Sequence, residues 1–163
     1  MSLTIEELEA FVQKLAADTE RWAALVSHDP DHRTYGQIWD DDEVNAWVLC
    51  WSAADHDTGF HDHDVSAAAV TVIAGQVRED RLRLDGSARE IVYDAGQTLT
   101  VPPEAIHRVL HAGSGPAVTI HAYSPPLRKQ GAYALADDGI LTRVVQSWQD
   151  ELKADTALLA GVH

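Results

Sequence analysis

The spacing of hydrophobic residues changes once along the chain, and the first part has helical spacing. Apolar residues recur there every three or four positions, at Leu8, Phe11, Val12 and Leu15. This periodicity predicts an amphipathic helix, and Thr4 followed by Glu7 has the form of a capping box at its start. A second short helix is expected over residues 20–26, before Pro30 ends it. We therefore expect residues 1–30 to form helices that pack on the part that follows.

From residue 35 to about residue 123, short apolar or alternating runs are separated by Gly, Pro, Asp and Asn. Runs at intervals of about ten residues are typical of an all-β sandwich or barrel. The candidate strands are 46–52, 59–63, 67–74, 76–80, 81–84, 90–93, 98–101, 107–111 and 117–123, with a turn at Asp85-Gly86. A further strand is predicted at 140–145 and a helix at 149–159. We expect one domain over residues 1–163, with residues 35–127 as its barrel core.

Composition narrows the range of partners. The 163 residues carry a net charge of −14, which argues against duplex nucleic acid and anionic membrane surfaces as partners. The chain has one cysteine, Cys50, so no disulfide can form within it. No signal peptide or membrane-spanning run is predicted from the sequence. We expect a soluble cytoplasmic protein that acts on a small molecule.

Histidines supply the candidate chemistry. In a strand, residues i and i+2 point to the same face, so His61 and His63 are expected to project together, with Asp62 on the opposite face. Two imidazoles on one face can share a metal ion if a third ligand comes from another strand. His107, in a later candidate strand, is that ligand. Three imidazoles suit Fe(II), and they also suit Zn, Ni or Cu.

The spacing around these histidines resembles the two motifs of the cupin superfamily. Gly75 stands where the first motif has its glycine, and Gly96 and Pro102 precede His107 as in the second motif. The carboxylate ligand of the first motif would fall near Ser66 or Ala67, which cannot bind a metal. The resemblance implies a double-stranded β-helix, or jelly-roll barrel, that holds one mononuclear metal ion with a neutral set of three histidines.

A second stretch makes the resemblance more specific. The run His121-Ala122-Tyr123-Ser124-Pro125-Pro126, together with the histidine motifs, resembles the cysteine dioxygenase family of thiol dioxygenases. The resemblance implies that Fe(II) is bound by His61, His63 and His107, and that Thr119, His121 and Tyr123 form a relay beside it. The implied reaction adds both atoms of O2 to the sulfur of a small thiol, such as cysteine or 3-mercaptopropionate, and gives a sulfinate.

Two positions depart from the family members that oxidise cysteine. Those members bind the substrate carboxylate with an Arg two residues after a Tyr, and here Tyr35 is followed at that spacing by Gln37. A neutral amide cannot make the bidentate charged pair that an Arg makes with a carboxylate. By the resemblance, Tyr35 and Gln37 contact the substrate, and Arg128 is a candidate for its carboxylate. Ala68 occupies the place of the cysteine that crosslinks to the tyrosine in mammalian members.

Other functions are compatible with the same residues. A three-histidine cupin can also be a dioxygenase that cleaves a carbon–carbon bond in a substrate without sulfur. It can be a metal-binding or regulatory cupin without catalysis, or an isomerase or lyase that uses Zn or Ni. O2 uptake with and without a thiol, ligand titration and metal analysis distinguish these functions.

Overall fold

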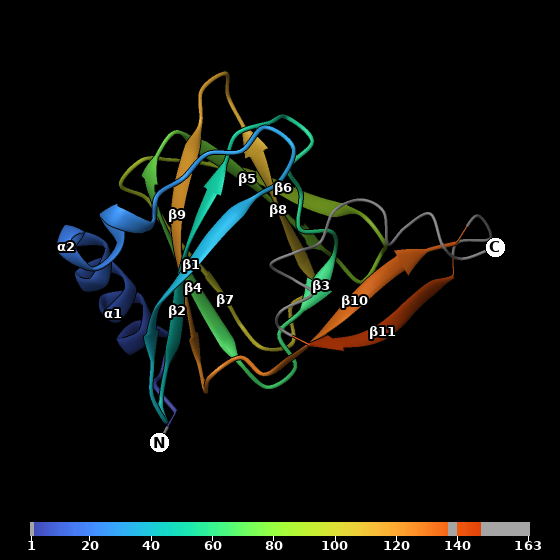
Figure 1. Ribbon diagram of the computed structural model, residues 1–163. Helices are drawn as coiled ribbons and strands as arrows, with labels where there is room; N and C mark the ends of the chain where they lie inside the picture. Colours follow the sequence, from blue (N-terminus) through green and yellow to red (C-terminus); the bar gives the residue numbers. More distant parts are fainter. Residues whose placement is uncertain (1, 137–139, 148–163) are drawn as a thin grey trace.

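The computed structural model describes residues 2–136 and 140–147 (Figure 1). The helical part comprises α1 (Ile5–Ala17), α2 (Thr19–Trp22) and the 3-10 helix η1 (Ala23–Leu25). The strands are β1 (Thr34–Asp40), β2 (Asn45–Trp51), β3 (His61–Asp62), β4 (Ala67–Ala74), β5 (Gln76–Leu82), β6 (Ala88–Asp94), β7 (Thr98–Val101), β8 (His107–Ala112), β9 (Ala117–Ser124), β10 (Lys129–Leu135) and β11 (Leu141–Ser147).

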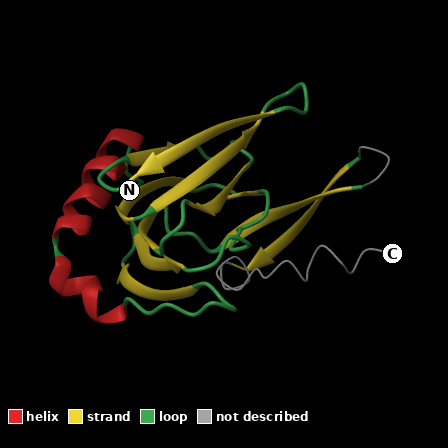
Figure 2. Ribbon diagram, turned by 90° about the horizontal axis from the view of Figure 1, so that it is seen from above, coloured by secondary structure: helices red, strands yellow, loops and turns green. Residues whose placement is uncertain are grey.

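The strands form two antiparallel sheets that face each other. One has the order β1-β2-β9-β4-β7 and the other the order β11-β10-β3-β8-β5-β6. Figure 2 shows the helices on the outer side of one sheet only. The predicted all-β barrel with an N-terminal helical cap is therefore confirmed.

Two hydrophobic clusters lie on the two faces of the five-stranded sheet. The inner cluster includes Trp47, Leu49 and Tyr123 and fills the space between the sheets. The outer cluster joins α1 to the sheet through side chains such as Leu8 and Val48. Strands β2 and β9 are consequently buried along their whole length. Burial on both faces explains why β2 and β9 contain long apolar runs instead of a regular alternation with polar residues.

The N-terminal helix begins as predicted. The hydroxyl of Thr4 accepts a hydrogen bond from the Glu7 backbone N–H at 3.2 Å, and the Glu7 carboxylate accepts one from the Thr4 N–H at 2.8 Å. The second helix is shorter than expected, because α2 ends at Trp22 and the chain continues as the 3-10 turn η1. Among the described residues, no helix is both long enough and apolar enough to cross a membrane.

The strand predictions hold for most of the barrel but differ in four places. The strand predicted at 59–63 is reduced to the two residues of β3, so His63 lies just after its end. Residues 76–80 and 81–84 were predicted as two strands, yet β5 runs continuously from Gln76 to Leu82. Strands β1 and β10 were not predicted, since an adjacent Gly and Gln break the apolar pattern of each. The predicted strand at 140–145 corresponds to β11. The predicted helix at 149–159 lies outside the described residues.

Gly75 lies at the tight turn between β4 and β5. Its φ angle is +70°, a conformation that side chains other than glycine rarely adopt. A Cβ atom there would also lie 2.5 Å from the carbonyl oxygen of Pro116. The glycine expected from the first motif is therefore required by backbone geometry.

Asp62 joins the short strand β3 to the β10–β11 hairpin. Its carboxylate accepts hydrogen bonds from Nε and Nη2 of Arg143 at 2.7 and 2.9 Å, from the Tyr133 hydroxyl at 2.6 Å and from the Gly131 N–H at 3.2 Å. Burial alone would raise the pKa of Asp62, but the hydrogen bonds from Arg143 and Tyr133 lower it well below its ordinary value. These contacts, called the Asp62 clamp below, hold the segment that carries His61 and His63, two of the candidate ligands.

We predict that Arg143→Gln lowers the free energy of unfolding by about 1 kcal/mol, because it removes two charge-assisted hydrogen bonds from a buried carboxylate. Native contacts lower the pKa of Asp62. The stabilisation that Asp62 provides is therefore complete above the pKa of an unfolded Asp, about 3.9, and is lost as the pH falls below that value. Urea unfolding at pH 7 measures the first effect, and its repetition at about pH 4 and about pH 2.5 measures the second.

Arg128→Gln is the matched control for this prediction. Its ion pair with Asp40 spans 3.3 Å and both side chains are exposed, at 59% and 42%, so its loss is expected to cost less than about 0.5 kcal/mol. Equal losses in the two variants would contradict the role assigned to the clamp.

Candidate metal centre

Three buried histidines meet between the two sheets. His61 in β3 lies directly opposite His107 in β8 in the strand register, and His63 follows two residues after His61 on the same face. The Nε2 atoms of His61 and His63 are 3.1 Å apart, and those of His107 and His63 are 3.3 Å apart. Among the described residues, these three form the one group of His, Cys, Asp and Glu side chains with the geometry of a metal site.

Hydrogen bonds at the opposite ring nitrogens decide which nitrogen is available to a metal. The Nδ1 of His61 is 2.9 Å from the carbonyl oxygen of Gly59, which can only accept a hydrogen bond. The Nδ1 of His107 is 3.0 Å from Oε1 of Glu79. We assign the proton to Nδ1 in both rings, which leaves their Nε2 lone pairs directed at His63. The Nε2 of His63 lies within hydrogen-bond distance of both: as an N–H it donates to one of these lone pairs, and as a lone pair it completes a set of three donors for a cation.

Burial keeps the His107 ring in the form that binds a metal. It lowers the pKa of His107 well below its ordinary value, and the neighbouring His61 and Arg81 lower it further. The imidazole is therefore neutral at physiological pH, as metal binding requires. Burial raises the pKa of Glu79, an effect that the guanidinium of Arg81 opposes. Arg81 donates to Glu79 through Nη2 at 2.6 Å and to the Thr100 carbonyl at 2.8 Å.

The spacing of the donor atoms fits one ion. A metal–nitrogen bond of about 2.1 Å places two ligands at right angles about 3.0 Å apart, and tetrahedral ligands about 3.4 Å apart. The observed separations of 3.1 and 3.3 Å lie between these values. The carboxylate ligand of the first cupin motif was expected to be missing here, with Ser66 or Ala67 in its place. Both residues are buried, and neither belongs to the ligand group.

A row of polar side chains from the five-stranded sheet reaches the same cavity. Thr119, His121 and Tyr123 alternate along β9, so all three point inward. Oγ1 of Thr119 lies 2.9 Å from Nε2 of His121, and Oη of Tyr123 lies 3.4 Å from Nδ1 of His121. The Tyr123 and His63 rings are in edge contact, with centroids 5.0 Å apart. Thus the predicted relay residues are adjacent to the histidine cluster.

The indole of Trp51 indicates the direction of hydrogen-bond donation along the row of Thr119, His121 and Tyr123. Its Nε1–H donates to Oγ1 of Thr119 at 2.9 Å, and an indole nitrogen can only donate. We therefore assign the Thr119 hydroxyl hydrogen to the bond with Nε2 of His121, and the His121 proton to Nδ1, facing Tyr123. In this assignment the Tyr123 oxygen accepts a hydrogen bond from Nδ1 of His121.

The cavity around the cluster has few polar lining atoms beyond those described. Its lining residues are Thr58, His61, His63, Val70, His107, Val109, His121 and Tyr123. None of these is an arginine or lysine. Among the described residues, the cavity wall therefore supplies no side-chain cation for a substrate carboxylate.

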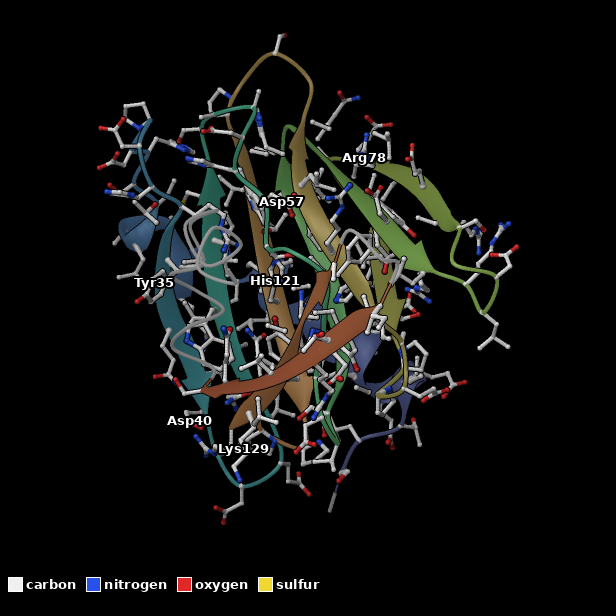
Figure 3. All side chains as sticks on the ribbon, turned by 90° about the vertical axis from the view of Figure 1, so that its right-hand side faces the viewer. Tyr35, Asp40, Asp57, Arg78, His121 and Lys129 are labelled. Atoms are coloured by element: carbon white, nitrogen blue, oxygen red, sulfur yellow. The ribbon has the colours of Figure 1, made fainter. Side chains whose placement is uncertain are left out.

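The structure places the predicted substrate-binding residues at different distances from this cavity. Tyr35 and Gln37 pair with Leu49 and Trp47 in the register, so they share the inner face of the sheet with the relay. Both are exposed on the edge strand β1, and Figure 3 shows Tyr35 at that edge and His121 inside the barrel. Arg128 is 59% exposed and pairs with Asp40. The structure does not bring Arg128 to the cavity wall.

Sequence reasoning missed three residues that support the site: Glu79, Arg81 and Trp51. Glu79 is 2% exposed although it lies in the charged run Arg78-Glu79-Asp80-Arg81, which suggests a solvent-exposed strand. Once β5 is treated as one strand, alternation puts Glu79 and Arg81 on the inner face with Val77. That alternation was the one signal that could have identified them.

Comparison with known proteins agrees with this geometry. The family model for cysteine dioxygenase type I matches residues 2–135. The chain belongs to this family. Human cysteine dioxygenase type 1 is 26% identical over 134 residues, which cover 76% of this chain and 66% of the human protein, slightly under two thirds of its length. The Danio rerio enzyme is 23% identical over 138 residues, covering 78% and 68%.

Solved structures agree on the fold. A Thermus thermophilus protein aligns with a TM-score of 0.56 and 15% identity over 64% of this chain and 93% of its own. A cupin superfamily protein from Desulfitobacterium hafniense aligns with a TM-score of 0.53 and 12% identity over 64% of this chain and 87% of its own. The expected cupin fold is thereby confirmed. Family membership and the histidine cluster together imply one mononuclear metal site.

We predict that Glu79→Gln weakens metal binding by about 10- to 100-fold, the usual effect of changing a partner that orients a ligand. The amide can still accept a hydrogen bond from His107, but it lacks the charge that increases the basicity of the ring. Competition with a chromophoric chelator for Zn(II) or Co(II) measures the affinity. Glu90→Gln, which changes a 59% exposed carboxylate on β6, is the control. Equal affinities in the two variants would contradict this role for Glu79.

Proposed function

We propose that this protein is an Fe(II)-dependent thiol dioxygenase that converts a small thiol and O2 into a sulfinate. The observation that carries the proposal is the meeting of three buried Nε2 atoms with the hydroxyl of Tyr123 in one cavity. Membership of the cysteine dioxygenase family supports the same reaction. In the balanced reaction, a thiolate and one O2 give one sulfinate: two S–O bonds form, the O–O bond breaks and sulfur is oxidised.

His61, His63 and His107 would hold the iron, which supplies activation of O2 and stabilises the thiolate form of the substrate when bound. The three ligands are neutral, so the ion would retain its full double charge at the site. A double positive charge favours an anionic ligand such as a thiolate over a neutral one. Cysteine thiolate and imidazole are both established ligand types for iron.

The relay residues position and hold a proton. Thr119 and Trp51 orient His121, and His121 directs its Nδ1–H at the oxygen of Tyr123. The Tyr123 hydroxyl would then donate to an oxygen atom at the reacting centre, where negative charge develops. The apolar side chains of Val70 and Val109 line the other walls and exclude water from the reaction.

Gln37 and Tyr35 would contact the distal part of the thiol, since both lie on the inner face of the sheet. Among the described residues, no Arg or Lys lines the cavity wall. The proposal therefore names a small thiol as the substrate and does not specify the charged group that the thiol carries. Cysteine, 3-mercaptopropionate and cysteamine differ in their charged groups and form an informative panel.

Anaerobically iron-loaded protein is expected to consume O2 with at least one thiol of this panel and to form sulfinate in a one-to-one ratio. An oxygen electrode and mass spectrometry measure the two quantities. If iron is verified in the site and no thiol gives sulfinate, the proposal fails. O2 uptake without a thiol would favour a dioxygenase that acts on a different substrate.

Tyr123→Phe is expected to lower kcat by about 10- to 100-fold, because it removes one positioned proton donor from the reacting centre. The iron content is expected to stay the same, since the side chain is not a ligand. Steady-state kinetics and metal analysis of the same samples test both statements. Unchanged kcat in a fully loaded variant would exclude Tyr123 from the reaction.

A further inference from the structure

A second cavity lies between β5, β6 and β7 and shares Glu79 with the surroundings of the histidine cluster. Its volume is about 240 Å³, and it is lined by Glu79, Arg81, Arg89, Ile91, Tyr93, Thr98, Leu99 and Thr100. These residues come from β5, β6 and β7. Glu79 belongs to both places, because it lines this cavity and its Oε1 also lies 3.0 Å from Nδ1 of His107.

Two arginines face this cavity from directly paired positions. Arg81 in β5 lies opposite Arg89 in β6 in the antiparallel register, so their side chains leave the sheet on the same face. Like charges in directly opposite positions destabilise a sheet. Glu79 is the one acidic residue among the lining residues. Its charge can balance one guanidinium, so the three groups together carry one positive charge.

The existing contacts leave donors available. Arg81 uses Nε and Nη2 for Glu79 and Thr100, and no hydrogen bond within the described part of the chain involves its Nη1. Arg89 forms no ion pair or side-chain hydrogen bond within that part, although it is close enough to lower the pKa of Glu79 against the effect of burial. A guanidinium carries five N–H donors, so several remain directed at the same small cavity.

From this arrangement we propose that the cavity is a binding site for one small oxyanion, a carboxylate or a sulfinate. Arg89 and Nη1 of Arg81 would donate to the anion, and the hydroxyl groups of Thr98 and Tyr93 line the same space. Bidentate pairing with planar or pyramidal oxyanions is the geometry that a guanidinium favours. The volume corresponds to about eight water molecules at about 30 Å³ each, enough for a small carboxylate or sulfinate. Because Glu79 contacts both Arg81 and His107, an occupant would share Arg81 with the carboxylate that orients a metal ligand.

The test uses the full chain loaded with Zn(II), which is diamagnetic, and follows the arginine Nε–Hε signals by NMR. Sodium acetate and sodium methanesulfinate are the two anionic probes, and acetamide is the neutral one. We expect the Arg81 and Arg89 signals to shift in a saturable manner with one or both anions and not with acetamide. The probe with the lower Kd identifies whether the site prefers a carboxylate or a sulfinate.

Arg89→Gln is expected to raise the Kd of the preferred anion by about 10-fold or more, because it removes a charge-assisted contact. Arg83→Gln removes the same charge from an arginine of the same hairpin that does not line the cavity, and it is expected to leave the Kd unchanged. Both arginines are exposed. Absence of saturable shifts, or equal effects of the two substitutions, would overturn the proposal. No thiol and no O2 are present, so this result is separate from the test of the dioxygenase activity.

Discussion

The three imidazoles of His61, His63 and His107 set the main constraint on this structure. Their Nε2 atoms converge within a dry interior, where unbalanced lone pairs are costly and a cation is strongly favoured. The backbone must hold them there without help from solvent. It does so through the pairing of β3 with β8 and through hydrogen bonds from the far side of two of the rings, from His61 to Gly59 and from His107 to Glu79.

The two sheets contribute different parts of the site. The candidate ligands come from the six-stranded sheet, and the relay of Thr119, His121 and Tyr123 comes from the five-stranded sheet. The chemistry therefore depends on the packing of one sheet against the other across the inner hydrophobic cluster. The helix α1 covers the outer face of the relay sheet, which allows β9 to be buried on both sides. A change in the packing between the sheets would alter the distance between Tyr123 and the ligands without changing either.

Buried carboxylates beside the histidines are paired with arginines. Asp62 is bonded to Arg143, Glu79 to Arg81, and Asp80 to Arg78 and Arg108. Each acidic group lies in or next to a strand that carries a candidate ligand. A buried carboxylate without a partner would cost several kcal/mol, so the arginines allow the acidic groups to orient the site. In a chain of net charge −14, these four arginines each neutralise a buried carboxylate.

The sequence by itself determined the fold class, the helical cap and the three histidines, because each depends on local spacing. Alternation along a strand is a backbone property, so the relay residues of β9 must share a face wherever that strand lies, and the extended spacing of His61 and His63 predicted the same for them although β3 ends at Asp62. The tertiary structure alone decided that Glu79 contacts His107, that Asp62 is clamped by Arg143 and that Trp51 reaches Thr119. These pairs are separated by 28, 81 and 68 positions. Strand order and register, rather than local sequence, bring them together, and the same register puts Arg81 opposite Arg89 and leaves Arg128 on the surface.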